Sequence, residues 1–306
     1  MSAYAVEAVG LTKKYGEQRV VDHLNLHVPQ GKIYGLLGRN GAGKTTTMKM
    51  LLNLARPTSG TIRLFGDDYK QQPDKTYRKI GSIIETPGFY DNLTGRENLT
   101  ILTRLRGRFN KSEIDRALET VGLEKEPHKL FSNYSLGMKQ RLGIAAAIMH
   151  DPELLILDEP INGLDPIGIH EIREFLLSLC REHGVTVFIS SHVLSEIEQL
   201  ADITGVMHEG RMVEEVDMCE LRDRNRQYAV FEVSDTTAAA VLLKRKFGIS
   251  DIAVGGNQIK AYGGIGERGE INACFVANGL SVTTVGVSDE TLEDYFSGLI
   301  GGKGIA

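Results

Sequence analysis

The sequence predicts an α/β fold followed by a smaller α+β domain, and three features carry this prediction. Short apolar runs at 154–157 and 185–189 flank an amphipathic segment, which is typical of parallel strands covered by helices on both faces. A glycine-rich loop at 38–45 joins another apolar run to a helical segment. Beyond about residue 225 the predicted order changes to strand, helix, two strands, helix and strand.

Composition places the 306-residue chain among ordinary globular proteins, with 42% hydrophobic and 25% charged residues. Its net charge of −5, with no basic segment standing out, gives no reason to expect a nucleic acid partner. Cys180, Cys219 and Cys274 are far apart in the sequence, so neither a metal motif nor a disulfide framework is expected. The chain starts without a secretory signal pattern and has no run of about 18 apolar residues, so we expect membrane contact only through another chain.

The first part of the chain is expected to contain several strands around one helix. Alternating apolar and polar residues predict strands at 5–9 and 20–28. The further elements predicted here are an apolar strand at 33–37, a helix over 46–54, and strands at 61–65 and 80–84.

An all-helical insert is expected over roughly 86–150. Thr94 and Glu97 form a capping-box pattern at the start of its first helix. The second helix has one apolar face, formed by Ile114, Ala117, Leu118 and Val121. A third helix is predicted to begin at Ser135.

Two short apolar strands and an α+β domain complete the predicted chain. The helix between strands 154–157 and 185–189 is expected to bury Ile169, Ile172, Phe175, Leu176 and Leu179. The last part has the βαββαβ order of a ferredoxin-like domain. Its predicted elements are strands 227–234, 250–255, 258–263 and 281–287, helices 237–247 and 268–278, and a final helix over 289–299.

The glycine-rich loop has the G-x-x-x-x-G-K-[ST] pattern of a phosphate loop, in the required setting between a strand and a helix. Its residues are Gly38, Arg39, Asn40, Gly41, Ala42, Gly43, Lys44 and Thr45. Glycines let backbone N–H groups turn toward anionic oxygens, and the helix N-terminus adds positive potential. We expect Lys44 to reach the β- and γ-phosphates and the Thr45 hydroxyl to hold Mg²⁺. A glycine-rich turn with a chance lysine is the alternative, and the motifs that follow count against it.

Two carboxylates, Asp158 and Glu159, follow the apolar strand 154–157. They stand at the carboxyl end of the predicted sheet, where α/β proteins bind their ligands. Asp158 is expected to orient Mg²⁺ or its water, and Glu159 to activate a water for attack on the γ-phosphate. The alternative is a solvated acidic strand end, which the phosphate loop upstream disfavours.

Six motifs together resemble the ATP-binding subunit of ABC transporters over about residues 4 to 220. In family order they are Tyr15, the phosphate loop 38–45, the signature 135–141, the Walker B strand 154–159, the D-loop 162–165 and the switch histidine His192. By itself, Ser135 is better explained as a helix N-cap. The resemblance implies a RecA-like P-loop NTPase core, an antiparallel β subdomain and a helical subdomain. It also implies ATP held between two copies in a head-to-tail homodimer.

The resemblance also assigns roles to the matching residues. Tyr15 would stack on adenine, and the phosphates would be bound by Gly38, Arg39, Asn40, Gly41, Ala42, Gly43, Lys44, Thr45 and Thr46. Ser135 and Gly137 would contact the γ-phosphate bound to the other copy, and Asp165 would cross the interface. The implied catalytic set is Glu159, His192 and Lys44. The implied metal ligands are Thr45, Glu85 and Asp158.

Two places depart from the family pattern. Leu136 and Met138 stand where the signature usually has Gly and Gln. Glu85 stands where a Gln usually contacts Mg²⁺ and water; a carboxylate still ligates Mg²⁺ but adds negative charge near the γ-phosphate.

The segment 83–99 around Glu85 resembles the bacitracin-resistance and lantibiotic-immunity branch of the family. In that branch the ATPase pairs with ABC-2-type permeases. Two uses of Pro87, Phe89 and Tyr90 stay open: receiving a cytoplasmic helix of the permease, or packing the helical insert.

The sequence therefore predicts an ABC cassette over 1–220 and an accessory domain over 225–306. We expect a cytoplasmic ATPase, peripheral on the inner face of the cell membrane, that uses ATP and Mg²⁺ to power a separate permease for a peptide antibiotic. A soluble ABC ATPase and a nucleotide-gated regulatory module that hydrolyses little are the alternatives. For the accessory domain, regulation, dimer contacts and permease docking all stay open.

Overall fold

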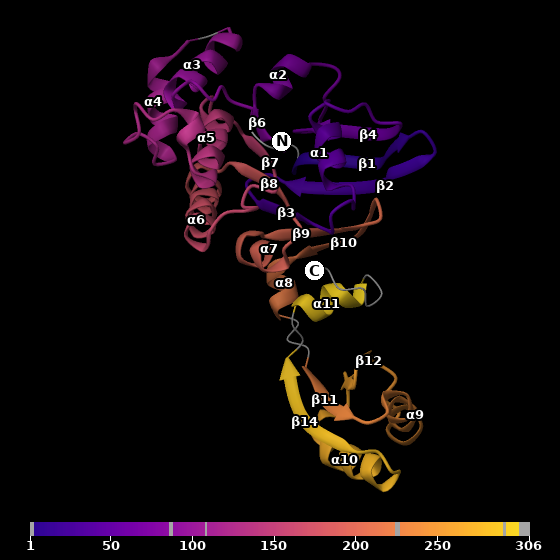
Figure 1. The fold of residues 1–306 in the computed structure, drawn as a ribbon. Coiled ribbons are helices and arrows are strands. Elements are labelled where there is room, and N and C mark those ends of the chain that lie inside the picture. The colour runs from indigo at the N-terminus through magenta and orange to yellow at the C-terminus, as the bar shows by residue number, and fades with distance from the viewer. Residues whose placement is uncertain (1–2, 86–87, 108, 224–226, 290–291, 300–306) are drawn as a thin grey trace. The chain divides into compact units, whose positions relative to one another are not determined.

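The computed structural model describes residues 3–85, 88–107, 109–223, 227–289 and 292–299. These residues divide into two compact units, one within 3–218 and one within 219–298. Each unit is described by itself (Figure 1).

The first unit contains ten strands and seven α-helices among its described residues. The strands are β1 (Tyr4–Tyr15), β2 (Gln18–Pro29), β3 (Ile33–Leu37), β4 (Ser59–Leu64), β5 (Asp67–Asp68), β6 (Ile80–Ile83), β7 (Leu154–Asp158), β8 (Thr186–Ser191), β9 (Ile203–His208) and β10 (Arg211–Asp217). The helices are α1 (Lys44–Leu51), α2 (Pro73–Tyr77), α3 (Gly95–Leu105), α4 (Lys111–Thr120), α5 (Leu136–Ile148), α6 (Pro166–His183) and α7 (Leu194–Leu200), with a 3₁₀ turn η1 (Phe131–Asn133).

A mixed six-stranded sheet forms the centre of this unit. Its strand order is β10-β9-β3-β8-β7-β6, and every neighbouring pair is parallel except β9 with β10. All residues of β3, β7 and β8 are buried, as expected for parallel strands covered on both faces. The carboxyl ends of β3, β7 and β8 therefore meet along one edge of the sheet, where the phosphate loop begins.

A second, antiparallel sheet has the order β2-β1-β4-β5. Its two long strands alternate between buried and exposed residues for most of their length, so one face packs on the core. In Figure 1, β1, β2 and β4 lie on one side of the unit, and α3, α4 and α5 gather on the other.

The helical insert has the predicted helices. Thr94 accepts a hydrogen bond from the Glu97 N–H, and the Glu97 side chain accepts one from the Thr94 N–H, so the predicted capping box is confirmed. Ser135 likewise accepts a hydrogen bond from the Met138 N–H at the start of α5. The apolar positions of α4 predicted from its periodicity are buried.

Some elements of the first unit differ from the prediction. Helix α1 ends at Leu51 rather than at residue 54, and Asn53 beyond it has a φ of +57°. Strands β9 and β10 were not predicted. In β9, a glycine and a threonine interrupt the apolar pattern. The glycine has a packing reason, since a Cβ at Gly205 would lie 2.1 Å from the Tyr34 hydroxyl.

The second unit has its elements in the predicted order. They are β11 (Gln227–Val233), α9 (Thr236–Phe247), β12 (Ile252–Gly255), β13 (Gln258–Ala261), the 3₁₀ turn η2 (Ile265–Glu267), α10 (Arg268–Ala277) and β14 (Val282–Asp289). The helices α8 (Met218–Asp223) and α11 (Leu292–Leu299) complete the described chain. The observed bounds of these strands and helices differ from the predicted bounds by up to three residues.

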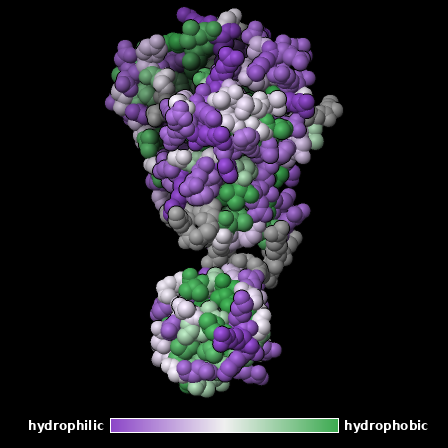
Figure 2. All heavy atoms as spheres, turned by 90° about the vertical axis from the view of Figure 1, so that its right-hand side faces the viewer, coloured by the Kyte–Doolittle hydropathy of each residue, from purple (hydrophilic) through white to green (hydrophobic). Residues whose placement is uncertain are grey.

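An antiparallel sheet of order β12-β13-β11-β14 forms the second unit. Its core joins strand and helix residues, with Phe231 of β11 and Phe275 of α10 packed edge to face at 5.2 Å between ring centroids. Figure 2 shows an apolar area on the surface of this unit. Separately, Val241, Val254 and Val276 are exposed apolar residues of α9, β12 and α10. None of the helices among the described residues combines the length and the apolar content of a membrane span.

Candidate nucleotide site

The phosphate loop lies between β3 and α1, and its glycines are required by close backbone approaches. A Cβ at Gly38 would lie 2.5 Å from the Met207 carbonyl oxygen. Gly43 has a φ of +103°, and a Cβ there would lie 2.6 Å from the Val20 carbonyl oxygen. Gly43 is the N-cap of α1 and offers no capping side chain, so the first N–H groups of the helix remain available to an anion. Arg39, Asn40 and Gly41 form the exposed tip of the loop, and Ala42 is buried beneath it.

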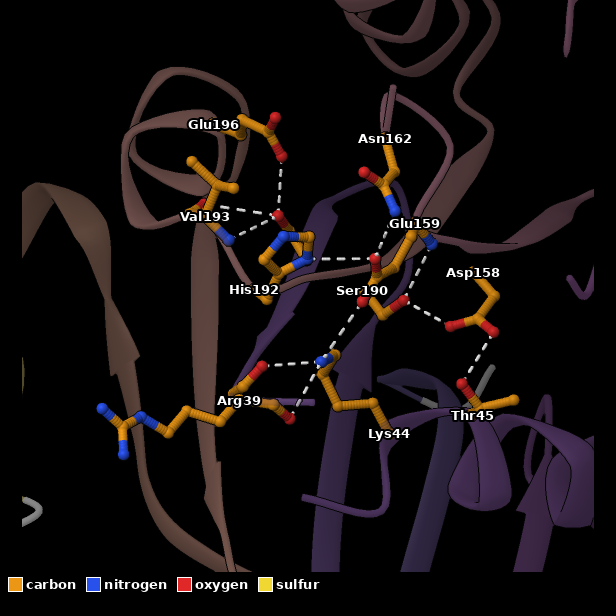
Figure 3. A network of polar contacts seen from close by, with 12 residues as sticks. Arg39, Lys44, Thr45, Asp158, Glu159, Asn162, Ser190, His192, Val193 and Glu196 are labelled. Carbon is orange, nitrogen blue, oxygen red and sulfur yellow. Dashed lines mark hydrogen bonds and ion pairs between the residues drawn. The ribbon is translucent and has the colours of Figure 1, made fainter. Parts of the chain in front are cut away.

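Lys44 is held inside the loop. Only 5% of its side chain is exposed, and its Nζ donates to the carbonyl oxygens of Gly38 at 2.6 Å and Arg39 at 3.3 Å. The same Nζ lies 3.4 Å from Glu159 Oε1 (Figure 3). The ammonium group is therefore fixed between the loop and the end of β7, where it can meet a phosphate oxygen.

Asp158 ends β7 and is bound through both carboxylate oxygens. Thr45 Oγ1 donates to Oδ2 at 2.8 Å, and Ser190 Oγ donates to Oδ1 at 2.6 Å. An Asp carboxylate beside a Thr hydroxyl is an oxygen donor set that suits Mg²⁺. Within the described residues, no three His, Cys, Asp or Glu side chains converge to hold a metal ion by themselves. The residues thus fit a Mg²⁺ that completes its coordination with phosphate oxygens and water.

Glu159 is surrounded by donors from three other segments. Its Oε1 faces Lys44, and its Oε2 lies 3.1 Å from Asn162 Nδ2 and 3.0 Å from His192 Nδ1. The carboxylate can only accept, which places the His192 proton on Nδ1. Glu159 has a φ of +47°, a conformation uncommon outside glycine and frequent at functional sites. The side chain is therefore pointed at the phosphate loop by its neighbours (Figure 3).

Hydrogen bonds of the neighbouring Ser191 side chain fix the turn that carries His192. Ser191 Oγ donates to Glu196 Oε2 at 2.6 Å and accepts from the Val193 N–H at 2.9 Å. Burial raises the pKa of Glu196 above its ordinary value, and the hydrogen bond from Ser191 opposes that shift. The imidazole is thus held beside Glu159 by a hydrogen-bonded loop.

Ser190 is a residue of this network that sequence reasoning missed. It is fully buried at the end of β8, donates to Asp158 and accepts from the Glu159 N–H at 2.9 Å. The only signal in the sequence was a polar residue closing an otherwise apolar strand. One hydroxyl thus fixes both carboxylate-bearing residues.

Replacing Ser190 by alanine should destabilise the protein by about 1–3 kcal/mol, because Asp158 and the Glu159 N–H each lose a buried partner. ATP turnover should fall as well, since both carboxylates are less well fixed. Thermal unfolding and phosphate release measure the two effects. Ser82→Ala, at an exposed position of β6, is the matched control. Wild-type stability and turnover in Ser190→Ala would contradict the assigned role.

The residues that the resemblance assigns to the nucleotide of the other copy lie apart from the phosphate loop. Ser135, Gly137 and Asp165 line one cleft of about 480 Å³ between the starts of α5 and α6, and no phosphate-loop residue lines it. Asp165 caps α6 by accepting from the Gly168 N–H at 2.9 Å. Leu136, the departure from the usual signature, is 52% exposed, and its Cδ2 would lie 3.1 Å from a Cβ at Gly163.

Tyr15 stands at the end of β1, with 53% of the residue exposed and Lys13 Nζ 4.6 Å from its ring centroid. Stacking on an adenine requires a free ring face, and Lys13 lies over one of the two faces of Tyr15. Thr46, in the first turn of α1, is half-buried.

Glu85 follows β6 and is 65% exposed, with Lys49 Nζ 2.6 Å from its Oε1. Pro87 lies outside the described residues. Phe89 packs against Phe131 of the helical insert at 5.2 Å between ring centroids, which favours the packing role for this residue. Tyr90 is 60% exposed, and its backbone N–H and carbonyl oxygen bond the Asn98 side chain of α3 at 2.8 and 3.1 Å.

Comparison with known proteins gives three findings. A sequence model of the family described as "ABC transporter" matches residues 21–162. The bacitracin transport ATP-binding protein BcrA of Enterococcus faecalis is 64% identical over 99% of this chain and 98% of its own length. The lantibiotic transport ATP-binding protein SrtF of Streptococcus pyogenes is 46% identical over 66% of this chain and 86% of its own length.

Among solved structures, the dimeric bacterial ABC transporter cassette MJ0796 matches with a TM-score of 0.63 and 22% identity, over 70% of this chain and 98% of that one. At this identity the likeness shows the fold alone. It agrees with a mixed central sheet, an antiparallel subdomain and a phosphate loop in the same chain. With a full-length relative at 64% identity, these findings establish that the chain belongs to the ABC transporter family, as an ATP-binding subunit with ATPase activity.

Proposed function

We propose that two copies of this chain bind two ATP molecules head to tail and power a separate ABC-2-type permease that exports or displaces a peptide antibiotic. The observation that carries the proposal is the contact of Glu159 with both Lys44 and His192 at the mouth of the phosphate loop. Such a set positions a base and a cation around one terminal phosphate.

Hydrolysis in this proposal needs no covalent intermediate. Glu159 takes a proton from the water that attacks the γ-phosphorus, and the bond to the β–γ bridging oxygen breaks to give ADP and phosphate. Lys44 offsets charge on the phosphate oxygens, and His192 orients Glu159 and the γ-phosphate. Mg²⁺, when bound by Thr45, Glu85 and Asp158, would supply further charge neutralisation at the phosphates.

The remaining assignments follow the same scheme. Tyr15 would stack on adenine, and the other nucleotide contacts would come from the backbone and side chains of 38–46. A second copy is required because the cleft of Ser135, Gly137 and Asp165 contains no phosphate-loop residue. These groups would contact the γ-phosphate held by the partner copy, helped by the N-terminal dipole of α5.

The cargo class is inferred from relatives named for bacitracin and lantibiotic transport. We place the protein in the cytoplasm, on the inner face of the membrane, where its permease would hold it. We assign residues 1–220 to the cassette and 225–306 to an accessory domain. The strand order β12-β13-β11-β14 supports a ferredoxin-like fold for that domain.

Growth of the native cells in bacitracin and in a lantibiotic tests this function. Deleting the gene should lower resistance to one of these peptides, and the wild-type gene should restore it. A gene carrying Glu159→Gln should restore none, although the protein is present at the normal level. Full restoration by that variant, or unchanged resistance on deletion, would contradict the proposal.

A further inference from the structure

The extra carboxylate of the nucleotide site, Glu85, has a dedicated counter-ion on α1. Thr45 and Lys49 are one helical turn apart and therefore share a face of α1. Thr45 bonds Asp158 at the end of β7, and Lys49 Nζ lies 2.6 Å from Glu85 Oε1 just beyond the end of β6. Strands β6 and β7 are parallel neighbours, with Ile83 paired to Leu157, so Asp158 and Glu85 follow the last paired residues of two adjacent strands, Glu85 one residue further on than Asp158.

The charges of the site are matched in pairs. Lys44 faces Glu159, and Lys49 faces Glu85, while Asp158 is held by two hydroxyls. The Tyr15 and Asp158 side chains also lie close enough to Lys49 to interact with its charge. Lys49 therefore lies near residues assigned to adenine and to the metal ion. A neutral glutamine at position 85 would need no such partner.

Glu85 is also fixed in an uncommon conformation. Its φ is +62°, which a side chain adopts at a cost unless surrounding contacts impose it. The contact with Lys49 is the ion pair that ties this strained residue to α1.

We propose that Lys49 is a positioning residue of the nucleotide site, which holds Glu85 in place and offsets its charge so that a triphosphate binds beside it. This inference rests on the proposed function, since it places the nucleotide at the phosphate loop. Without Lys49, the carboxylate would repel the phosphates and lose its fixed position.

ATP binding by the full-length protein tests the inference, measured by calorimetry at low ionic strength, once with EDTA and once with Mg²⁺. Lys49→Met should weaken ATP binding about fivefold to tenfold in EDTA, and less in Mg²⁺, because the cation offsets the freed carboxylate. Lys49→Arg should restore most of the affinity. In a Glu85→Gln background, Lys49→Met should change the affinity by less than about twofold.

Lys79→Met is the matched control. Lys79 Nζ lies 2.9 Å from Glu153 Oε1, so the two residues form an exposed ion pair of similar geometry, and neither belongs to the phosphate loop. It should leave ATP affinity unchanged. An equal loss from Lys49→Met in the wild-type and Glu85→Gln backgrounds, or no loss in either, would overturn the role of Lys49. Failure of the wild type to bind ATP, or wild-type affinity in Lys44→Ala, would instead overturn the proposed function.

Discussion

Replacing Glu159 by glutamine should leave ATP binding almost intact and lower the rate of hydrolysis about 10²- to 10⁴-fold. Glutamine keeps the size of the side chain and its contacts with Asn162 and His192, but it cannot take the proton of the attacking water. ATP should therefore stay bound, and the paired form should accumulate. Single-turnover hydrolysis and size-exclusion chromatography with ATP measure these two outcomes.

Glu153→Gln is the control for this experiment, because Glu153 is an exposed carboxylate at the opposite end of the same strand, just before β7. Its hydrolysis rate should equal that of the wild type. A Glu159→Gln protein that hydrolyses ATP at the wild-type rate would show that Glu159 is not the base.

Replacing Lys44 by alanine should weaken ATP binding about 10- to 100-fold, because charge-assisted hydrogen bonds to phosphate are each worth about 1.5–3 kcal/mol. Only 5% of the Lys44 side chain is exposed, so its ammonium group is already desolvated and positioned before the nucleotide arrives. Binding of a fluorescent ATP analogue to the purified variant gives the affinity.

Lys44 also donates to two carbonyl oxygens of its own loop, so a folding defect has to be separated from a binding defect. The unfolding temperature of the nucleotide-free variant makes this separation. A folded Lys44→Ala protein that binds ATP as tightly as the wild type would contradict the phosphate-loop assignment.

Features that depend on local chemistry were predictable from the sequence. The phosphate loop is a contiguous motif whose glycines, lysine and threonine have fixed spacing, and the structure places Lys44 and Thr45 beside the two carboxylates at the end of β7. The capping box at Thr94 is equally local. The family resemblance placed His192 and Glu159 in one catalytic set, but their direct contact was not predicted, because 33 residues separate them.

Features that depend on long-range packing were not predictable. Ser190 gains its role from Asp158 and Glu159, at the end of the neighbouring strand β7. Lys49 gains its role from Glu85, beyond the end of β6. Strand β9 was missed because Gly205 is there to fit Tyr34, which is distant in sequence. The closeness of Leu136 to Gly163 was also not predictable, because only the fold brings the signature and the D-loop together.

Purification of the tagged, full-length protein from mild-detergent extracts of its native cells, followed by mass spectrometry, tests most directly whether it powers a permease. We expect one or two polytopic membrane proteins to be recovered with it in fixed proportion. We also expect ATP hydrolysis by this complex to change when the peptide antibiotic is added. Recovery of soluble partners alone, from a protein absent from the membrane fraction, would contradict the transport function and favour a soluble ABC ATPase.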